Sequence, residues 1–462
     1  MDKSSVLGET KIASLLWSFS VPAIIGMVVN ALYNVVDSIF VGHGVGEIGL
    51  VAVSIAFPLM LILMAVGMLV GVGASALVSI RLGEKDKAGA ELILGNALSM
   101  IIVFVVVTTV AVLSYLDPIL IKLGATPEVL PYARDFTSII MLGSVFMHVS
   151  FGLNNIIRAQ GDPATALKTM LIAALLNIVL NPLFIFGLNM GIKGSAWATV
   201  LAQAVSTVWV LTYFFRGVGT LQLKKCYLAI RVDIVAAITK IGLAPFLMQI
   251  GTSLVMVIFN FSLLEHGGVL AVAAFGIINR VFILMLMPIL GISQGAQPII
   301  GYNYGAGKYR RVIETIKLAT AAATAVCILG FIGVQIFDEQ IIRLFNNNPE
   351  LIQLGSTGLR LFLIMLPLIG FQIISANYFQ AVGKAGYSII LNLLRQIIIL
   401  IPMVYVLPQF LGLAGIWLAG PISDFGAALL TGVFIFREIK QLGHAEETAE
   451  ETEELVVQDA PN

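Results

Sequence analysis

Residues 22–44 read PAIIGMVVNALYNVVDSIFVGHG, and residues 245–267 read PFLMQIGTSLVMVIFNFSLLEHG. Both stretches begin with proline, end with His-Gly and are apolar over the roughly 20 residues that a spanning helix needs. They differ at Asp37, where the second stretch has Asn260. Asp at the centre of a membrane helix costs about 2.5 to 3.5 kcal/mol on insertion scales. The pair predicts two copies of one membrane unit, of which only the first keeps an acid.

Composition supports a membrane class. Of 462 residues, 59% are hydrophobic and only 11% are charged, whereas soluble domains carry about 25% charged residues. Mean hydropathy is +0.99, which predicts a polytopic membrane protein. The two cysteines, Cys226 and Cys327, lie in different contexts, which argues against a disulfide framework and a cysteine metal site. The polar N-terminus is followed by no cleavage signal, so we expect the first span to be retained.

The apolar segments predict an all-α integral membrane fold with twelve spans in two pseudo-symmetric bundles of six. Six spans per copy give both copies the same orientation, so the bundles are expected to face each other across a central cavity. The predicted spans are 13–41, 49–80, 93–114, 136–157, 166–188, 192–215, 235–264, 269–302, 316–337, 360–381, 387–408 and 412–436. The predicted domains are an N-terminus at 1–12, an N-lobe at 13–215, a linker at 216–234, a C-lobe at 235–437 and an acidic tail at 438–462.

Loop charges predict the orientation. Seventeen Lys and Arg residues fall on the side that holds both termini and the linker, against five on the other side. The positive-inside rule therefore places both termini in the cytoplasm. The acidic tail has little apolar surface to bury, so we expect it to be a mobile cytosolic end.

Four motifs carry a family resemblance. They are PAIIGMVVNALYNVVDSIFVGHGVGEIGLVAVS at 22–54, VGVGASALVSIRLGEKDKA at 70–88, NNIIRAQGDPATAL at 154–167 and GISQGAQPIIGYNYGAGKYRRV at 291–312. Their order resembles the multidrug and toxic compound extrusion (MATE) transporters over about residues 10–440. The resemblance implies a V-shaped, twelve-helix exporter of organic, often cationic compounds, driven by inward flow of Na⁺ or H⁺. An acid on the first helix without acidic counterparts in the second half is typical of the DinF/MepA-like branch.

The resemblance also implies the location, the oligomeric state and the partners of the protein. It implies a monomer in the plasma membrane of a prokaryote, with both termini cytoplasmic. Its partners would be small amphipathic or cationic molecules and membrane lipids, with no nucleic acid. It implies no enzymatic activity and no cofactor beyond the coupling ion.

A candidate cation site lies in the first copy. Asp37 falls in the outer half of its span, and Asn177 and Asn181 fall on one face of the fifth span at a similar depth. Thr199 lies two turns into the sixth span, so the side-chain oxygens of all four residues are expected at one depth in the membrane. Oxygen ligands suit hard cations such as Na⁺, and a desolvated carboxylate can instead carry a proton. The resemblance implies the same four positions.

Two features bear on that site. Many DinF-like proteins have a second Asp where this chain has Asn181, which puts a two-carboxylate proton mechanism in doubt. A purely structural role, in which Asp37 hydrogen-bonds Asn177 or Tyr33, is the alternative. Asn177 and Asn181 align with Ile399 and Met403 of the second copy; this absence of a second polar pair favours ion coupling over a structural role.

Other polar residues fall within predicted spans. Arg280 and Arg395 each have Asp424 as a candidate partner, and the alternative is a substrate or gating network. His148 is interpreted as a hydrogen-bonded interior histidine in preference to a proton relay. The candidates for a substrate cavity are Tyr33, Asn34, Met27, Asn154, Met256, Asn260, Met287, Arg280, Gln372 and Asn377.

Three functions from two classes remain in view. The first is a cation-coupled multidrug exporter, and the second is a flippase or exporter of a lipid-linked metabolite on the same fold. The flippase would need a more cationic cavity than Arg280 and Arg395 provide. A membrane-embedded enzyme would need a clustered catalytic or metal motif, and the sequence has neither that nor a phosphate-binding loop.

Overall fold

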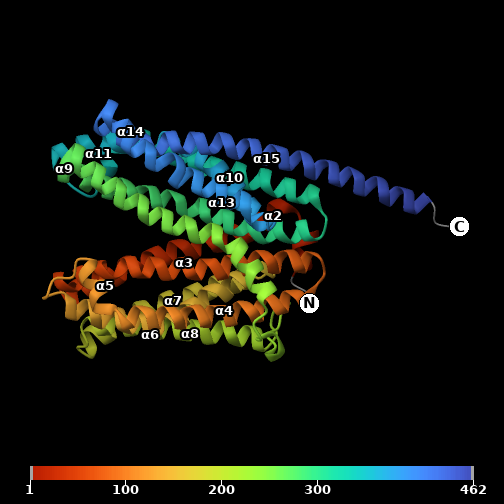
Figure 1. Cartoon of the computed structure of the whole chain (residues 1–462), viewed down its shortest axis with the longest axis horizontal. Coiled ribbons are helices and arrows are strands. Elements are labelled where there is room, and N and C mark those ends of the chain that lie inside the picture. Colours follow the sequence, from red (N-terminus) through yellow and green to blue (C-terminus); the bar gives the residue numbers. More distant parts are fainter. Residues whose placement is uncertain (1–3, 459–462) are drawn as a thin grey trace. The chain divides into compact units, whose positions relative to one another are not determined.

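The computed structural model describes residues 4–458, with side chains to residue 447, and these residues are helical without any strand. Figure 1 follows the helices along the chain. The first unit's elements are α1 (Ser5–Glu9), α2 (Ile12–Gly44), α3 (Glu47–Gly83), α4 (Lys87–Ser114), α5 (Leu116–Lys122), α6 (Leu130–Ala159), α7 (Pro163–Pro182), η1 (Leu183–Gly187), α8 (Ile192–Phe215) and η2 (Lys225–Tyr227), of which α1 and the start of α2 are shared with the second unit. Then follow α9 (Val232–Gly305), α10 (Tyr309–Arg343), α11 (Pro349–Phe362), α12 (Leu366–Ala381), α13 (Ala385–Leu393), η3 (Leu394–Ile399), α14 (Leu400–Leu411) and α15 (Leu413–Gln458).

The described helices account for the predicted spans. Ten of them are long and apolar enough to cross a membrane, and α11 with α12 forms an eleventh span, bent by 47°. The 74-residue α9 contains a non-helical Gly268, with φ 65° and ψ −165°, and therefore holds two spans. Splitting α9 there gives twelve spans, and the predicted all-α membrane fold is confirmed.

One span differs from its expected form. The sequence predicts a single helix over 360–381, but α11 begins at Pro349 and the span bends between Phe362 and Leu366. Pro367 lies in the first turn of α12. It has no N–H to donate to the preceding turn, so a continuous helix cannot pass through this point.

The chain forms two compact units. The first contains the chain up to Val6 and Val21–Ile250, and the second contains Leu7–Ser20 together with the chain from Gly251 onward. The chain therefore passes between the units inside α1, inside α2 and again inside α9. Pro22 and Pro245 lie close to the crossings in α2 and α9, where a missing backbone hydrogen bond makes a helix easier to bend.

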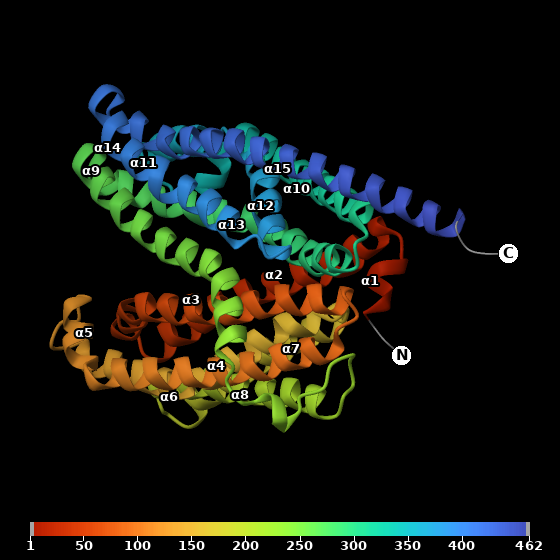
Figure 2. The same cartoon turned by 45° about the vertical axis from the view of Figure 1, so that its right-hand side comes forward.

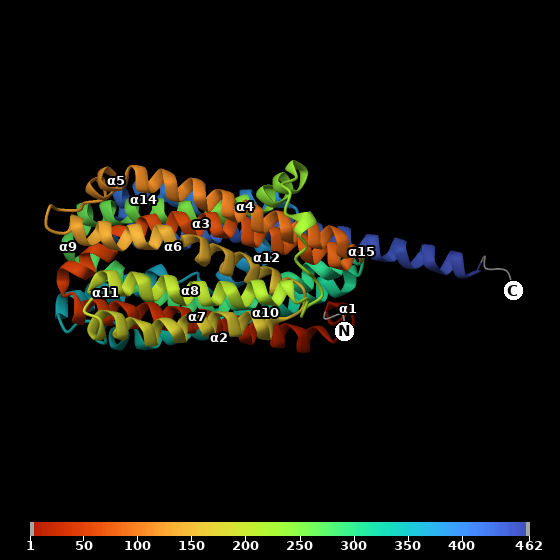
Figure 3. The same ribbon diagram turned by 90° about the horizontal axis from the view of Figure 1, so that it is seen from below.

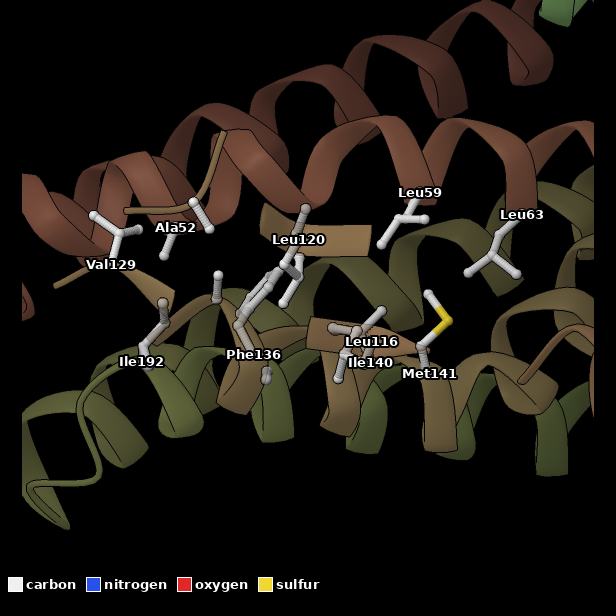
Figure 4. Close-up of a cluster of buried hydrophobic side chains, with 14 of the residues drawn as sticks. Ala52, Leu59, Leu63, Leu116, Leu120, Val129, Phe136, Ile140, Met141 and Ile192 are labelled. Carbon is white, nitrogen blue, oxygen red and sulfur yellow. The ribbon is translucent and has the colours of Figure 1, made fainter. Parts of the chain in front are cut away.

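The first unit has an apolar core between α3, α5, α6 and α8. Figure 4 shows Leu59 and Leu63 of α3 above Phe136 and Met141 of α6, with Leu120 of α5 between the layers. All five are at least nine-tenths buried. This core holds α8 against α6 and so fixes the helix that carries Thr199.

Close packing of α3 against the first part of α9 depends on glycine. A Cβ built on Gly242 would lie 1.7 Å from the backbone oxygen of Leu69, and one on Gly73 would lie 2.3 Å from that of Ile238. Because these neighbours are backbone atoms, they cannot rotate away. Only glycine lets the two helices approach this closely.

We expect Gly242→Ala to destabilise the protein by about 1–3 kcal/mol or more, because the added methyl group must push α9 away from α3. Thermal unfolding in detergent micelles would measure this. Gly276→Ala on the same helix is the matched control, since no atom lies within 4 Å of its built Cβ. Equal unfolding temperatures for the two variants would contradict the close-packing argument.

The linker is docked on α4 of the first unit. Asn96 donates to the Tyr227 carbonyl at 3.2 Å and accepts from the Arg231 backbone N–H at 2.7 Å. The Lys224 ammonium lies 2.5 Å from the buried carboxylate of Glu91. This hydrogen bond raises the pKa of Lys224 above its usual value. These polar contacts hold the basic linker, which separates the two copies of the repeat along the chain, on α4.

The N-terminal segment packs within the second unit. Leu7, Ile12 and Phe19 are buried with Ile299 of α9. The guanidinium of Arg311 donates to the carbonyls of Leu7 and Thr10, at 3.1 and 2.6 Å. Figure 2 shows α1 beside the turn between α9 and α10.

The acidic stretch predicted as a tail begins within α15, which continues to Gln458 (Figure 1). Glu438 is buried, and it accepts a hydrogen bond from the Tyr378 hydroxyl at 3.0 Å. The Lys384 ammonium lies 2.5 Å from the same carboxylate oxygen. The start of the predicted tail is thus fixed to α12 of the second unit.

Candidate functional site

The predicted site residues come from three helices of the first unit. Asp37 lies on α2, Asn177 and Asn181 lie on α7, and Thr199 lies on α8. Figure 3 shows α7 and α8 side by side. Asp162 caps the start of α7 by accepting from the Thr165 N–H at 3.1 Å, so the register of both Asn residues is set from that end.

The backbone changes directly after Asn181. Pro182 has no N–H to donate to the preceding turn, and the helix widens into the π-helical segment η1 over Leu183–Gly187. Such widened turns are frequent at functional sites. Gly191, with φ 55°, then ends the turn into α8. This short connection brings α8 back along α7 and aligns their polar faces.

The four predicted residues form one hydrogen-bond network. The Asn181 amide donates to Asp37 Oδ1 and lies 3.4 Å from Asn177 Oδ1. The Asn177 amide in turn donates to Thr199 Oγ1 at 3.0 Å. The predicted oxygens therefore do meet at one place inside the first unit. Tyr33 makes no described hydrogen bond to Asp37; instead Asn181 contacts the acid.

Ser195 is a further member that sequence reasoning missed. Its hydroxyl donates to Asp37 Oδ1 at 3.1 Å, and the residue is completely buried. A signal was present, because Ser195 precedes Thr199 by four residues and so shares its helix face. The same spacing relates Asn177 and Asn181.

The network fits a small monovalent cation. Asn181 Oδ1 is buried and accepts no described hydrogen bond, and a buried oxygen without a partner is costly. It belongs to the side chain whose amide nitrogen contacts Asp37 Oδ1 and lies 3.4 Å from Asn177 Oδ1. A set of one carboxylate with neutral oxygens suits a hard ion of single charge. Within the described residues, no group of three or more His, Cys, Asp or Glu could hold a metal ion.

Two chemical states of this site are available. With a cation bound, Asp37 and the amide and hydroxyl oxygens would supply ligands. With a proton bound, the same carboxyl would be neutral and no other acid in the network could share the proton, since position 181 is Asn. Either state removes the uncompensated charge from the buried network.

The candidate cavity residues fall in both units. Met27, Tyr33, Asn34 and Asn154 belong to the first unit, and the other six belong to the second. Asn154 and Gln372 are buried within their own units, whereas Asn34 is exposed. In the second unit the Asn377 amide donates to the Ser293 hydroxyl. A common cavity lined by these residues stays a prediction, as do their individual roles. The exposed candidates of the second unit are Met256, Asn260 and Arg280, and Met287 is half-buried.

Two of the three charged side chains singled out within the predicted spans of the second unit, Arg395 and Asp424, form an ion pair. Arg395 Nε lies 2.6 Å from Asp424 Oδ1, with only 17% and 8% of the two side chains exposed. Arg395 lies in the π-helical segment η3, and the Ser423 hydroxyl donates to its carbonyl oxygen. Of the two pairings considered for Asp424, the structure contains the one with Arg395. Arg280 is exposed and forms no ion pair within the described residues.

Comparisons with known proteins agree with this architecture. The sequence profile of the MatE family matches residues 22–183 and 245–406, two stretches that start and end at the same 223-residue spacing as the internal repeat. The chain is 28% identical over 428 residues to the multidrug export protein MepA of Staphylococcus haemolyticus (strain JCSC1435), covering 93% of this chain and 94% of that protein.

Solved structures show the same relationship. The MATE multidrug transporter DinF-BH, solved as a complex, is 42% identical with a TM-score of 0.88, covering 95% of this chain and 98% of that one. A multidrug resistance MATE family transporter of the MOP superfamily, solved in an outward-facing conformation, is 26% identical with a TM-score of 0.90, covering 96% and 99%. The chain therefore belongs to the MatE family, that of the multidrug and toxic compound extrusion transporters, and to its DinF/MepA-like branch.

Proposed function

We propose that this protein is a secondary active multidrug efflux transporter that exports organic, often cationic compounds in exchange for Na⁺ or H⁺. The coupling ion would bind at Asp37, with Asn177, Asn181, Thr199 and Ser195 as the surrounding polar groups. The observation that carries this proposal is one buried carboxylate network present in the first copy of the repeat. The multidrug export of the MepA and DinF-BH relatives supports the substrate class.

The repeat separates the fold from the ion site. Asp37 aligns with Asn260, and the two Asn residues of α7 align with Ile399 and Met403. A group needed only to hold a bundle together would be expected in both copies. The network therefore has a role that belongs to the first unit alone, and coupling is such a role.

Coupling works through differential affinity. An ion that binds one arrangement of α2, α7 and α8 more tightly than another shifts the population between them. If the same rearrangement changes the affinity for drug, the two ligands are linked, and the effect is reciprocal. Alternating access then lets the inward ion gradient drive drug export. The energy source is ionic, since the sequence has no nucleotide-binding motif.

The membrane location and the class of substrate follow from the family and from the apolar helices. The protein is a multi-pass membrane protein of the bacterial plasma membrane, and its substrates are small molecules rather than nucleic acids. The relatives are transporters, so an enzymatic activity is not expected. We further propose that both termini lie in the cytoplasm, from the loop charges, and that the protein acts as a monomer in contact with lipid.

Purified protein in liposomes tests the proposal. The Na⁺ gradient and the pH gradient are imposed in separate experiments. We expect one of them to drive efflux of a fluorescent organic cation, and that gradient identifies the coupling ion. Protein-free liposomes provide the background. Equal dye movement with and without both gradients would contradict secondary active transport.

A flippase for a lipid-linked metabolite is the alternative on the same fold. It would bind an anionic headgroup and so would need several unpaired cations. The Arg395–Asp424 pair leaves Arg395 neutralised, and Arg280 is then the remaining membrane arginine among the candidates. Headgroup translocation without dye efflux in the same liposomes would favour this alternative.

A further inference from the structure

The ion pair of the second unit uses only part of the Arg395 guanidinium. Arg395 Nε donates to Asp424 Oδ1 at 2.6 Å. An arginine side chain carries five N–H groups, of which four belong to the two Nη atoms. Within the described residues neither Nη atom of Arg395 forms a hydrogen bond, and neither is fully buried. The two Nη atoms therefore form an edge of donors, the free edge, that has no acceptor in the described part of the protein.

Two adjacent residues of α15 hold Arg395 in place. Asp424 binds its guanidinium, and the Ser423 hydroxyl donates to its backbone oxygen. The same oxygen accepts from the Leu400 N–H, five residues later, as in a π-helical turn. Such turns are frequent at functional sites. Because Arg395 is fixed at both its head and its backbone, it can bind a ligand with little further loss of side-chain freedom.

The repeat assigns this guanidinium to the second copy alone. In the register that pairs Asn177 with Ile399, Arg395 aligns with Ala173. Arg395 lies four residues, and so about one turn, before the position equivalent to Asn177. A group needed only to hold a bundle together would be expected in both copies. Equivalent helices of the two copies thus carry different chemistry, an amide pair in the first and a guanidinium in the second.

The free edge is the part of the pair that a dissolved compound can reach. Only 17% of the Arg395 side chain and 8% of the Asp424 side chain are exposed. Charged side chains within membrane spans face the interior of a bundle or a water-filled space, because lipid tails cannot solvate them. The accessible Nη atoms of Arg395 are therefore expected to face water or a bound solute.

The net charge of the pair decides which acceptor fits the free edge. Taking both ions out of water is costly, and their mutual attraction at 2.6 Å offsets that cost, so the pair is held as a neutral unit. A carboxylate or phosphate on the free edge would add a third charge with no cation left to balance it. A neutral carbonyl adds no charge, and it accepts from a charged donor, which makes the stronger kind of hydrogen bond. The free edge therefore suits an ester, amide or ketone oxygen.

We propose that Arg395 is a substrate-binding residue of the second unit, whose free edge donates hydrogen bonds to a neutral carbonyl oxygen of the exported compound. Asp424 and Ser423 are positioning residues, because they act through Arg395. The inference rests on the proposed drug export and adds a chemical preference to it. Among cationic compounds that share one ring system, those with a carbonyl group bind more tightly.

Two dyes with the same cationic ring system isolate this contact. Tetramethylrhodamine methyl ester has an ester carbonyl, and tetramethylrosamine lacks the ester group. The fluorescence anisotropy of each dye, titrated with purified protein in detergent micelles, gives the two dissociation constants without any ion gradient. We expect the wild type to bind the ester dye about tenfold more tightly than tetramethylrosamine, because a hydrogen bond from a charged donor contributes at least that much.

Variants of the pair identify the donor. Arg395→Lys keeps a cation for Asp424 but removes the guanidinium fork, so the free edge is lost without leaving an unpaired charge. We expect this variant to bind the ester dye about tenfold more weakly than the wild type and to bind tetramethylrosamine equally well. The double variant Arg395→Met, Asp424→Leu, which removes both charges, is expected to show the same loss. Arg437→Gln, which removes an exposed arginine of α15, is the control and should bind both dyes normally.

The outcomes separate this inference from the proposed function. If Arg395→Lys weakens the binding of both dyes equally, or of neither, the carbonyl contact is wrong while drug binding stands. A lowered unfolding temperature of Arg395→Lys with an unchanged preference for the ester dye would show that the pair is purely structural. If the wild type binds neither dye above the background of empty micelles, the proposed drug export is contradicted together with this inference.

Discussion

Asp37→Asn is expected to abolish ion-coupled drug efflux, reducing it to the level of protein-free liposomes, while the protein still folds. Asn has nearly the same shape and keeps a side-chain oxygen that can accept from Asn181 and Ser195, so the network need not rearrange. What it loses is the only carboxylate of the network. Neither Na⁺ nor H⁺ would then find a charge to neutralise, and the gradient could no longer do work.

The measurement is dye efflux from liposomes under the gradient that drives the wild type, together with the unfolding temperature. Glu265→Gln is the matched control, because it removes an exposed acid from the second copy, five residues after the position equivalent to Asp37. We expect this control to transport normally. Wild-type efflux by Asp37→Asn would refute the proposed coupling, and a lowered unfolding temperature would indicate a structural role instead.

Asp424→Ala is expected to lower the free energy of unfolding by about 3–5 kcal/mol. The substitution leaves the largely buried guanidinium of Arg395 without its partner. An unpaired charge in the apolar interior pays the cost of leaving water with no attraction to offset it. Unfolding in detergent micelles would measure this loss.

The double variant Arg395→Met, Asp424→Leu tests the cause. Replacing both partners with apolar groups removes the buried charges together, and such replacements are often neutral or stabilising. We therefore expect the double variant to recover most of the stability that Asp424→Ala loses. If the double variant is as unstable as the single one, packing rather than charge would account for the loss.

Much of the fold could be predicted because membrane helices are recognisable from local sequence. The length of each apolar segment is set by the bilayer, and the repeat at 223 residues was visible from Pro22 and Pro245. The bend before α12 was not predicted in form, since a proline shows that a bend is favoured but not how far the helix extends beyond it. The start of α11 at Pro349 lies in a segment of mixed polarity that the span criterion passed over.

The candidate site was predictable in part for a related reason. Asp37 stands out as a charge in an apolar helix, and the pairs of polar residues on α7 and α8 follow helical spacing. Ser195 escaped notice because one serine in a membrane helix is common and carries no charge. Its role depends on which neighbour its hydroxyl reaches, and that neighbour lies 158 residues away.

The sequence by itself determined the membrane class, the number of spans, the duplication and the restriction of the acid to the first copy, since these depend on composition and on spacing along the chain. Only the tertiary structure decided that Asn181 and Ser195 contact Asp37, that Asp424 pairs with Arg395 and that the buried His148 contacts two backbone carbonyls. The physical reason is range. Hydrophobic burial acts on whole segments and leaves a periodic trace in the chain, whereas a hydrogen bond forms only where two atoms lie about 3 Å apart, a distance fixed by how separate helices pack.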